Sequence, residues 1–213
     1  MDDRTDPHLR MTEASAAAVS QPPSATEDQG LVPVRPRRPL RELLPRGARA
    51  VAVVAVSGAL VAADFAHFGV TSWAFIGLVL CPVMVLLTAI DFEHRLLPNV
   101  IVLPAALAVL AIVAVSAPHH LVTHLAAGVA LGGFFFASAA FFPGSIGFGD
   151  AKLGLLIGLA LGSQTFIAVE IALGCVLVVA LWIVFTQGAA ARKKAIAFGP
   201  FLALGAIVGF FLA

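Results

Sequence analysis

Two aspartates of the sequence, Asp91 and Asp150, stand at the ends of long apolar runs. Asp91 ends the run Trp73–Ile90, and Asp150 opens another run of apolar residues. A charge inside a lipid bilayer costs free energy unless it has a partner or a function. Two carboxylates at one site can cleave a peptide bond without a covalent intermediate, because an ionised one takes a proton from water and a protonated one stabilises the oxyanion. The sequence therefore predicts that Asp91 and Asp150 form a catalytic pair.

The predicted helix positions give the two aspartates different roles. Repulsion between like charges favours a state in which the pair shares one proton. Asp150 begins a helix, whose positive end stabilises the ionised form, and Lys152 adds to this effect. Asp91 ends a helix, whose negative end favours the protonated form. We expect Asp150 to be the resting base and Asp91 the resting acid.

Two glycines, Gly147 and Gly149, stand next to Asp150. Glycine permits positive φ and lets the backbone of a substrate approach closely, as cleavage of an extended strand requires. A plain turn before a helix, with Asp150 as its N-cap, accounts for the same residues. The glycines are thus compatible with both interpretations.

The composition places these residues in a membrane protein. The chain has 213 residues, of which 60% are hydrophobic and 12% charged, whereas about a quarter of the residues in a soluble domain are charged. Its mean hydropathy of +1.00 indicates several membrane passes. The net charge of +1 gives no support for a nucleic-acid partner. Two cysteines inside apolar runs indicate neither a disulfide framework nor a zinc site.

The apolar segments predict an all-α, multi-pass integral membrane helical bundle of about seven transmembrane helices, six of them in the catalytic core. The fifth predicted helix is short for a span of about 20 residues, so we expect it to be tilted or to start deeper. Pro98 belongs to the first turn of the third helix, and the chain breaks between Asp91 and Pro98. The predicted helices cover residues 49–68, 72–91, 98–117, 121–142, 151–162, 165–186 and 197–213.

Three regions follow from this pattern. Residues 1–45 are polar and rich in proline, which predicts a disordered cytoplasmic tail that ends in a basic collar. Residues 46–71 form an extra N-terminal transmembrane helix, and residues 72–213 form a membrane-embedded peptidase domain.

The positions of the basic residues predict the orientation. With the N-terminus inside, every Lys and Arg lies at the inner face, including Arg95, Lys152 and Arg192–Lys194, and the outer turns contain none. We therefore expect Asp91 and Asp150 at the cytoplasmic face of the plasma membrane.

Other polar residues keep alternatives open. Asp64 and Glu170 lie towards the outer halves of their helices, and intramembrane acids can relay protons. A proton-coupled small transporter is therefore an alternative, and a structural or assembly subunit is another. His120 and His124 share a helix face, where a hydrated membrane edge is a simpler interpretation than a metal. We expect neither a metal nor a cofactor.

Three segments resemble motifs of the type IV prepilin peptidases, a family of GxGD-type intramembrane aspartyl proteases. Residues 91–99, DFEHRLLPN, are similar to the first motif, in which Pro-Asn or Pro-Asp follows seven residues after an aspartate. Residues 147–153, GFGDAKL, resemble the second motif with its Lys-Leu extension. Residues 198–205, FGPFLALG, resemble the motif of the C-terminal helix. Together the motifs cover about residues 72–213.

The resemblance implies an inner-membrane aspartic-type endopeptidase. Such an enzyme removes the short basic leader of pilin-like and pseudopilin precursors of type IV pilus and protein secretion systems, after a glycine on the cytoplasmic side. The chain resembles the short form without the cysteine-rich cytoplasmic domain, and nothing in it indicates a methyl-donor site for N-methylation. The expected partners are the precursors and membrane lipid; the precursor's identity and the oligomeric state stay open. By motif match the catalytic residues are Asp91 and Asp150, and the supporting residues are Gly147, Gly149, Lys152, Pro98 and Asn99.

Overall fold

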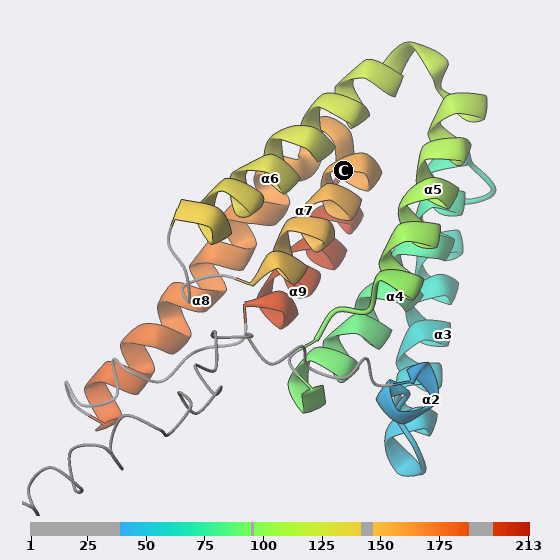
Figure 1. Ribbon diagram of the computed structural model, residues 1–213. Coiled ribbons are helices and arrows are strands. Elements are labelled where there is room, and N and C mark those ends of the chain that lie inside the picture. Colours follow the sequence, from blue (N-terminus) through green and yellow to red (C-terminus); the bar gives the residue numbers. More distant parts are fainter. Residues whose placement is uncertain (1–38, 95, 142–146, 188–197) are drawn as a thin grey trace, which may run out of the picture. The chain divides into compact units, whose positions relative to one another are not determined.

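The computed structural model describes residues 39–94, 96–141, 147–187 and 198–213, all of which belong to one compact unit, residues 39–213. Within these residues the chain forms a short helical turn, α2, followed by seven longer helices (Figure 1). The bounds are α2 Leu40–Leu43, α3 Ala48–Phe68, α4 Ser72–His94, α5 Asn99–Ser116, α6 Leu121–Phe141, α7 Phe148–Leu161, α8 Thr165–Gln187 and α9 Gly199–Phe211, with 3-10 turns η1 Pro118–His120 and η2 Gly162–Gln164.

The helices have the length and composition of membrane spans. Five described helical stretches are long and apolar enough to cross a bilayer, and the last of them, Phe148–Thr186, contains both α7 and α8. These two helices separate at Gly162, whose φ of 55° is accessible to glycine and turns the chain. The short apolar helix Gly199–Phe211 follows. The prediction of an all-α membrane bundle is confirmed.

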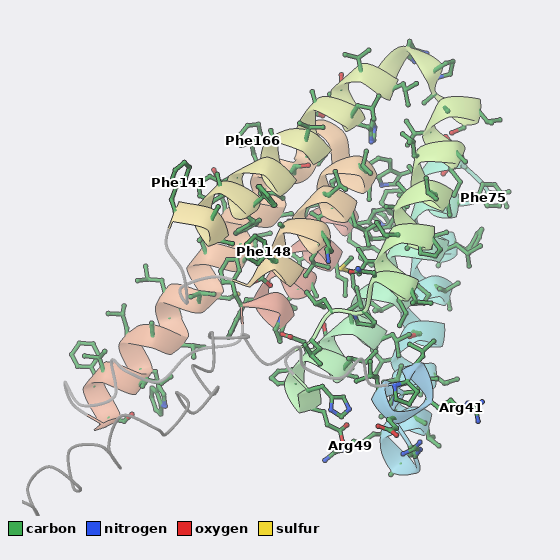
Figure 2. The ribbon with its side chains drawn as sticks, in the orientation of Figure 1. Arg41, Arg49, Phe75, Phe141, Phe148 and Phe166 are labelled. Atoms are coloured by element: carbon green, nitrogen blue, oxygen red, sulfur yellow. The ribbon has the colours of Figure 1, made fainter. Side chains whose placement is uncertain are left out.

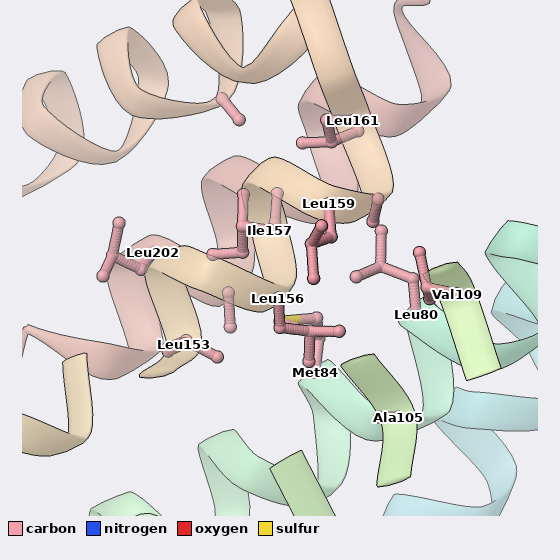
Figure 3. Close-up of a cluster of buried hydrophobic side chains, with 14 of the residues drawn as sticks. Leu80, Met84, Ala105, Val109, Leu153, Leu156, Ile157, Leu159, Leu161 and Leu202 are labelled. Carbon is pink, nitrogen blue, oxygen red and sulfur yellow. The ribbon is translucent and has the colours of Figure 1, made fainter. Parts of the chain in front are cut away.

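The helix α7 lies at the centre of the bundle. Nine of its 14 residues are buried, which is why its sequence is apolar on every face. It packs most extensively on α6 and also contacts α4, α5 and α9. The packing against α6 is close because Gly158 leaves no room for a side chain: an ideal Cβ there would lie 2.5 Å from the backbone of Ala127 and Gly128. Figure 3 shows the core that results, with Leu153, Leu156 and Ile157 of α7 among its members.

The helix α3 lies at the edge of the bundle and packs mainly on α4. Of its residues, all of which the structure describes, only Asp64 is buried. At the other end of α3, Arg49 pairs with Glu93 of α4 at 3.0 Å. The helix that the sequence analysis assigned to residues 46–71 is thus attached through few buried contacts.

The predicted boundaries needed corrections near the aspartates. The helix α4 continues to His94, so Asp91 lies in its last turn and not at its end. The helix α5 begins at Asn99, and Pro98 is its N-cap, with its carbonyl accepting bonds from the next turn. The helix α7 begins at Phe148, so Asp150 is its third residue and the N-cap is Gly147.

The turn α2 lies inside the segment that was predicted to be a disordered tail. Residues 40–43 form this turn, and Leu43 is buried. The rest of the predicted tail up to residue 38 lies outside the described residues, as do Arg95 and Arg192–Lys194.

Candidate active site

Asp91 and Asp150 meet at the first residue of α9. A Cβ placed in ideal geometry on Gly199 would lie 2.6 Å from Asp91 Oδ2 and 3.8 Å from Asp150 Oδ1. The two oxygens therefore lie no farther apart than these two distances combined. Asp91 is only 8% exposed and Asp150 is partly buried, so two negative charges here would repel each other. The fold thus brings together the two aspartates that the sequence singled out.

The two carboxylate oxygens of Asp150 have different surroundings. Its Oδ2 accepts a hydrogen bond from the backbone N–H of Gly147 at 3.3 Å, while its backbone N–H donates to the Gly147 carbonyl at 3.0 Å. These bonds fix the side chain at the first turn of α7. They satisfy Gly147 and leave Oδ1 as the oxygen on the side of Gly199 and Asp91.

The supporting residues of the sequence analysis hold the beginnings of α5 and α7 together. Lys152 Nζ donates a hydrogen bond of 2.6 Å to Asn99 Oδ1. Asn99 is the first residue of α5 and directly follows the N-cap Pro98. An ideal Cβ on Gly149 would lie 3.0 Å from a side-chain carbon of Leu97, so this glycine permits close packing of the connection between α4 and α5.

Neither Gly147 nor Gly149 adopts a positive φ. The conformational reason that the sequence suggested for these glycines is therefore not observed. At Gly149 the close approach of Leu97 explains the glycine, whereas at Gly147 an ideal Cβ would meet no described neighbour nearer than Asp150 Oδ2 at 3.8 Å.

Two residues of this site, Gly199 and Leu97, were not among the predicted site residues. The signal for Gly199 was present in the sequence as a Gly-Pro pair that opens the last apolar helix, a position where proline is favoured. Spacing alone did not indicate that this glycine would face both aspartates. For Leu97 no signal exists, because a leucine in an apolar chain is common.

The basic residues of the described part gather at the end of the bundle that holds the aspartates. Lys152 is next to the site, and Figure 2 shows Arg41 and Arg49 at α2 and the beginning of α3. Arg46 lies between them and donates a hydrogen bond of 2.7 Å to the carbonyl of Arg41. The predicted clustering of positive charge at one end is confirmed for these residues, and the others lie outside the described part.

The remaining polar candidates are not part of this site. Asp64 is fully buried against Gly77 of α4 and Phe210 of α9, and neither of its oxygens has a hydrogen-bond partner among the described residues. Glu170 is exposed on α8, so the two acids have different surroundings. His124 donates from Nδ1 to the carbonyl of Leu159 at 2.8 Å, which gives this histidine a structural partner.

Comparison with known families now decides what kind of protein carries these two aspartates. The model of the type IV leader peptidase family matches residues 78–190. The chain belongs to this family. Comparisons with curated proteins and with solved structures find no match.

The matched range contains Asp91, Asp150 and each of the five supporting residues, but it ends before α9. Family membership therefore indicates a membrane peptidase and includes both aspartates. The contact with Gly199 is an observation of the structure alone.

Proposed function

We propose that this chain is a prepilin leader peptidase that cleaves the short basic leader from type IV pilin-like precursors by a two-aspartate mechanism. The observation that carries the proposal is the approach of Asp91 and Asp150 to one glycine, Gly199. Two carboxylates this close repel each other when both are ionised. A pair that shares one proton can both activate water and hydrogen-bond a carbonyl oxygen.

In the proposed reaction Asp150 is the base and Asp91 is the acid. Asp150 takes a proton from a water molecule as the water oxygen bonds to the carbonyl carbon of the scissile peptide, and Asp91 gives its proton to the carbonyl oxygen. The tetrahedral intermediate then collapses: the C–N bond breaks, the leaving amine takes the proton from Asp150, and Asp91 takes a proton back from a hydroxyl of the intermediate, which becomes the new carboxyl group. The assignment is supported by the N–H of Gly147, which donates to Asp150, and by the position of Asp91 in the last turn of α4.

The supporting residues position this pair. The bond between Lys152 and Asn99 joins the first turn of α7, which carries Asp150, to the start of α5. The packing of Leu97 on Gly149 brings the connection after α4 against the same turn. Both contacts limit movement of Asp150 relative to Asp91, and a displacement of about 1 Å in an active site can lower a rate about 100-fold.

We further propose that cleavage takes place at the cytoplasmic face of the inner membrane. The support is that Arg41, Arg46, Arg49 and Lys152 lie at the end of the bundle that holds the aspartates, and cytoplasmic segments are enriched in Lys and Arg. A basic leader that has not crossed the membrane lies on the same side. Residues 1–45 would then be a cytoplasmic tail.

The test is replacement of each aspartate by asparagine, which keeps the size of the side chain and removes its acid–base function. Asp91→Asn and Asp150→Asn are each expected to lower the rate of precursor cleavage at least about 1000-fold, measured with purified protein in proteoliposomes by the mass of the product. Asp64→Asn is the matched control, because it neutralises a buried carboxylate outside this site; it is expected to cleave at close to the wild-type rate. Cleavage by both dyad variants at the wild-type rate would contradict the mechanism.

A further inference from the structure

Asp64 is a fully buried carboxyl group that the proposed reaction does not use. It belongs to α3, which lies beside α4 at the edge of the bundle (Figure 1). An ideal Cβ on Gly77 of α4 would overlap Asp64 Oδ2 and lie 2.5 Å from Phe210 Cζ of α9. The glycine thus leaves room for the carboxyl group between the three helices. Asp64 is also the only buried residue of α3, every residue of which is described. The buried contact between α3 and the bundle is therefore made by a group that can carry a charge.

The surroundings of Asp64 suit its protonated form and not its ionised form. Neither carboxyl oxygen has a hydrogen-bond partner among the described residues, whereas an ionised carboxylate accepts several hydrogen bonds. Cys81 of α4 interacts with Asp64 electrostatically but carries no positive charge, and α9 contributes the uncharged Phe210. On α3 itself His67 is exposed, with its ring against Phe211. No described group thus compensates a negative charge here, and burial of an uncompensated charge costs far more than burial of a neutral acid.

An aromatic cluster packs next to Asp64, on the side of the nearer end of α3. Phe68, one turn after Asp64, has its ring 5.3 Å from that of Phe210 and 6.2 Å from that of Phe211. Trp73 stacks on Phe210 at 5.3 Å. Because Asp64 is 0% exposed, water reaches it only when this packing or the contact between α3 and α4 opens. Loss of the proton and movement of α3 are therefore coupled, since the proton passes to water and the charge that remains must be hydrated.

The geometry of α3 turns a small opening at Asp64 into a large displacement at the other end of the helix. The helix ends at Gly69, whose φ of 65° turns the chain towards α4. At 1.5 Å per residue Asp64 lies about 7.5 Å from Gly69, and Arg49 lies about 30 Å from it. A rigid swing about Gly69 that opens about 2.8 Å at Asp64, the diameter of a water molecule, moves Arg49 by about 11 Å. This movement breaks the 3.0 Å ion pair between Arg49 and Glu93, which stands two residues after Asp91.

We propose that Asp64 is a proton-dependent latch that holds α3 against the bundle. With its proton, the neutral acid lies between α4 and α9, and α3 is docked as in the structure. When the proton passes to water, the carboxylate leaves this site to become hydrated, and α3 swings away about Gly69. The swing separates Arg49 from Glu93, which belongs to the same turn of α4 as Asp91. The inference does not depend on the proposed function, because it concerns the docking of α3 and involves no substrate.

The distance between two spin labels measures the position of α3. The labels are attached to Val51→Cys near the start of α3 and Leu107→Cys on α5, two positions that are 68% and 66% exposed. The two native cysteines are free and are removed as Cys81→Ala and Cys175→Ser. Double electron–electron resonance in proteoliposomes gives the distribution of distances between the labels. As the pH is raised from acidic to alkaline, we expect a second population to appear at a distance about 10 Å longer.

Asp64→Asn in the same labelled protein is the matched control, because it keeps the size of the side chain and cannot ionise. It is expected to show the shorter distance at every pH. A reference pair of labels at Leu107→Cys and Val129→Cys, on α5 and α6, is expected to keep a constant distance. An unchanged distance to α3 over the pH range in which the protein stays folded would overturn the proposal. The same change in Asp64→Asn, or a parallel change in the reference pair, would overturn it as well.

Infrared spectroscopy tests the protonation of Asp64 directly. The difference between the spectra of the wild type and Asp64→Asn removes the contribution of the other carboxyl groups. At acidic pH we expect it to contain the C=O stretching band of a protonated carboxyl group, and to lose this band over the pH range in which α3 moves. Absence of the band at every pH would show that the buried group carries no proton. Loss of the band without a change in the label distance would show that α3 stays docked on an ionised Asp64. Either result contradicts the latch and leaves the proposed function unaffected.

Discussion

Replacement of Gly199 by alanine tests the geometry of the site with a single methyl group. The added Cβ would lie 2.6 Å from Asp91 Oδ2 and 3.2 Å from Asp91 Cγ, whereas ordinary contact begins at 3.4 Å. The carboxylate of Asp91 must therefore move by about 0.8 Å, or α9 must move away. A displacement of about 1 Å in an active site lowers the rate about 100-fold, so we expect kcat of Gly199→Ala to fall by about this factor.

The expected loss does not come from unfolding. Gly199 has no positive φ and begins α9, so its backbone conformation suits alanine. The assay measures kcat and KM for precursor cleavage in proteoliposomes together with the thermal unfolding midpoint in detergent. Gly174→Ala, in open space on α8, is the control and is expected to match wild type in both assays. If Gly199→Ala keeps the wild-type kcat, the two carboxylates are not held against Gly199 during the reaction, and our reasoning about the dyad is wrong.

Two more predictions concern the contacts that support the site. Gly158→Ala is expected to destabilise the protein by about 1–3 kcal/mol through overpacking, because its Cβ would lie 2.5 Å from the backbone of α6; an unfolding midpoint equal to that of Gly174→Ala would contradict this. Lys152→Ala and Asn99→Ala are expected to be coupled by about 1 kcal/mol, since each removes the same 2.6 Å hydrogen bond. A double-mutant cycle on the free energy of unfolding measures this coupling, and strictly additive effects would show that the bond contributes nothing.

The helices were predictable from the sequence because the length of a continuous apolar segment decides whether it can span a bilayer. In a bilayer interior the backbone must satisfy its own hydrogen bonds, and a continuous apolar run of about 20 residues has the length of a membrane-spanning helix and is too long for a barrel strand. The start of α3 at Ala48 and the end of α8 at Gln187 lie within one residue of the predicted limits. The limits near the aspartates were less accurate, because polar residues such as Glu93 and His94 continue α4 past the apolar run.

The pairing of Asp91 with Asp150 could be predicted because both were expected at the same depth and on the same side of the membrane. The detailed geometry of the pair could not be predicted. Both aspartates were expected at the same end of the bundle, and Gly199 confirms that they meet there. Which face of α7 turns towards α4 depends on packing around Gly158 and the buried leucines, and a helix that is apolar on all sides carries no stripe to indicate it.

The position of Gly199 has a consequence for the synthesis of the protein. Asp91 and Asp150 emerge from the ribosome well before α9, and a nascent chain that contains only α3 to α8 lacks the residue against which both carboxylates pack. The site therefore reaches its complete geometry only when α9 has entered the membrane beside α4 and α7.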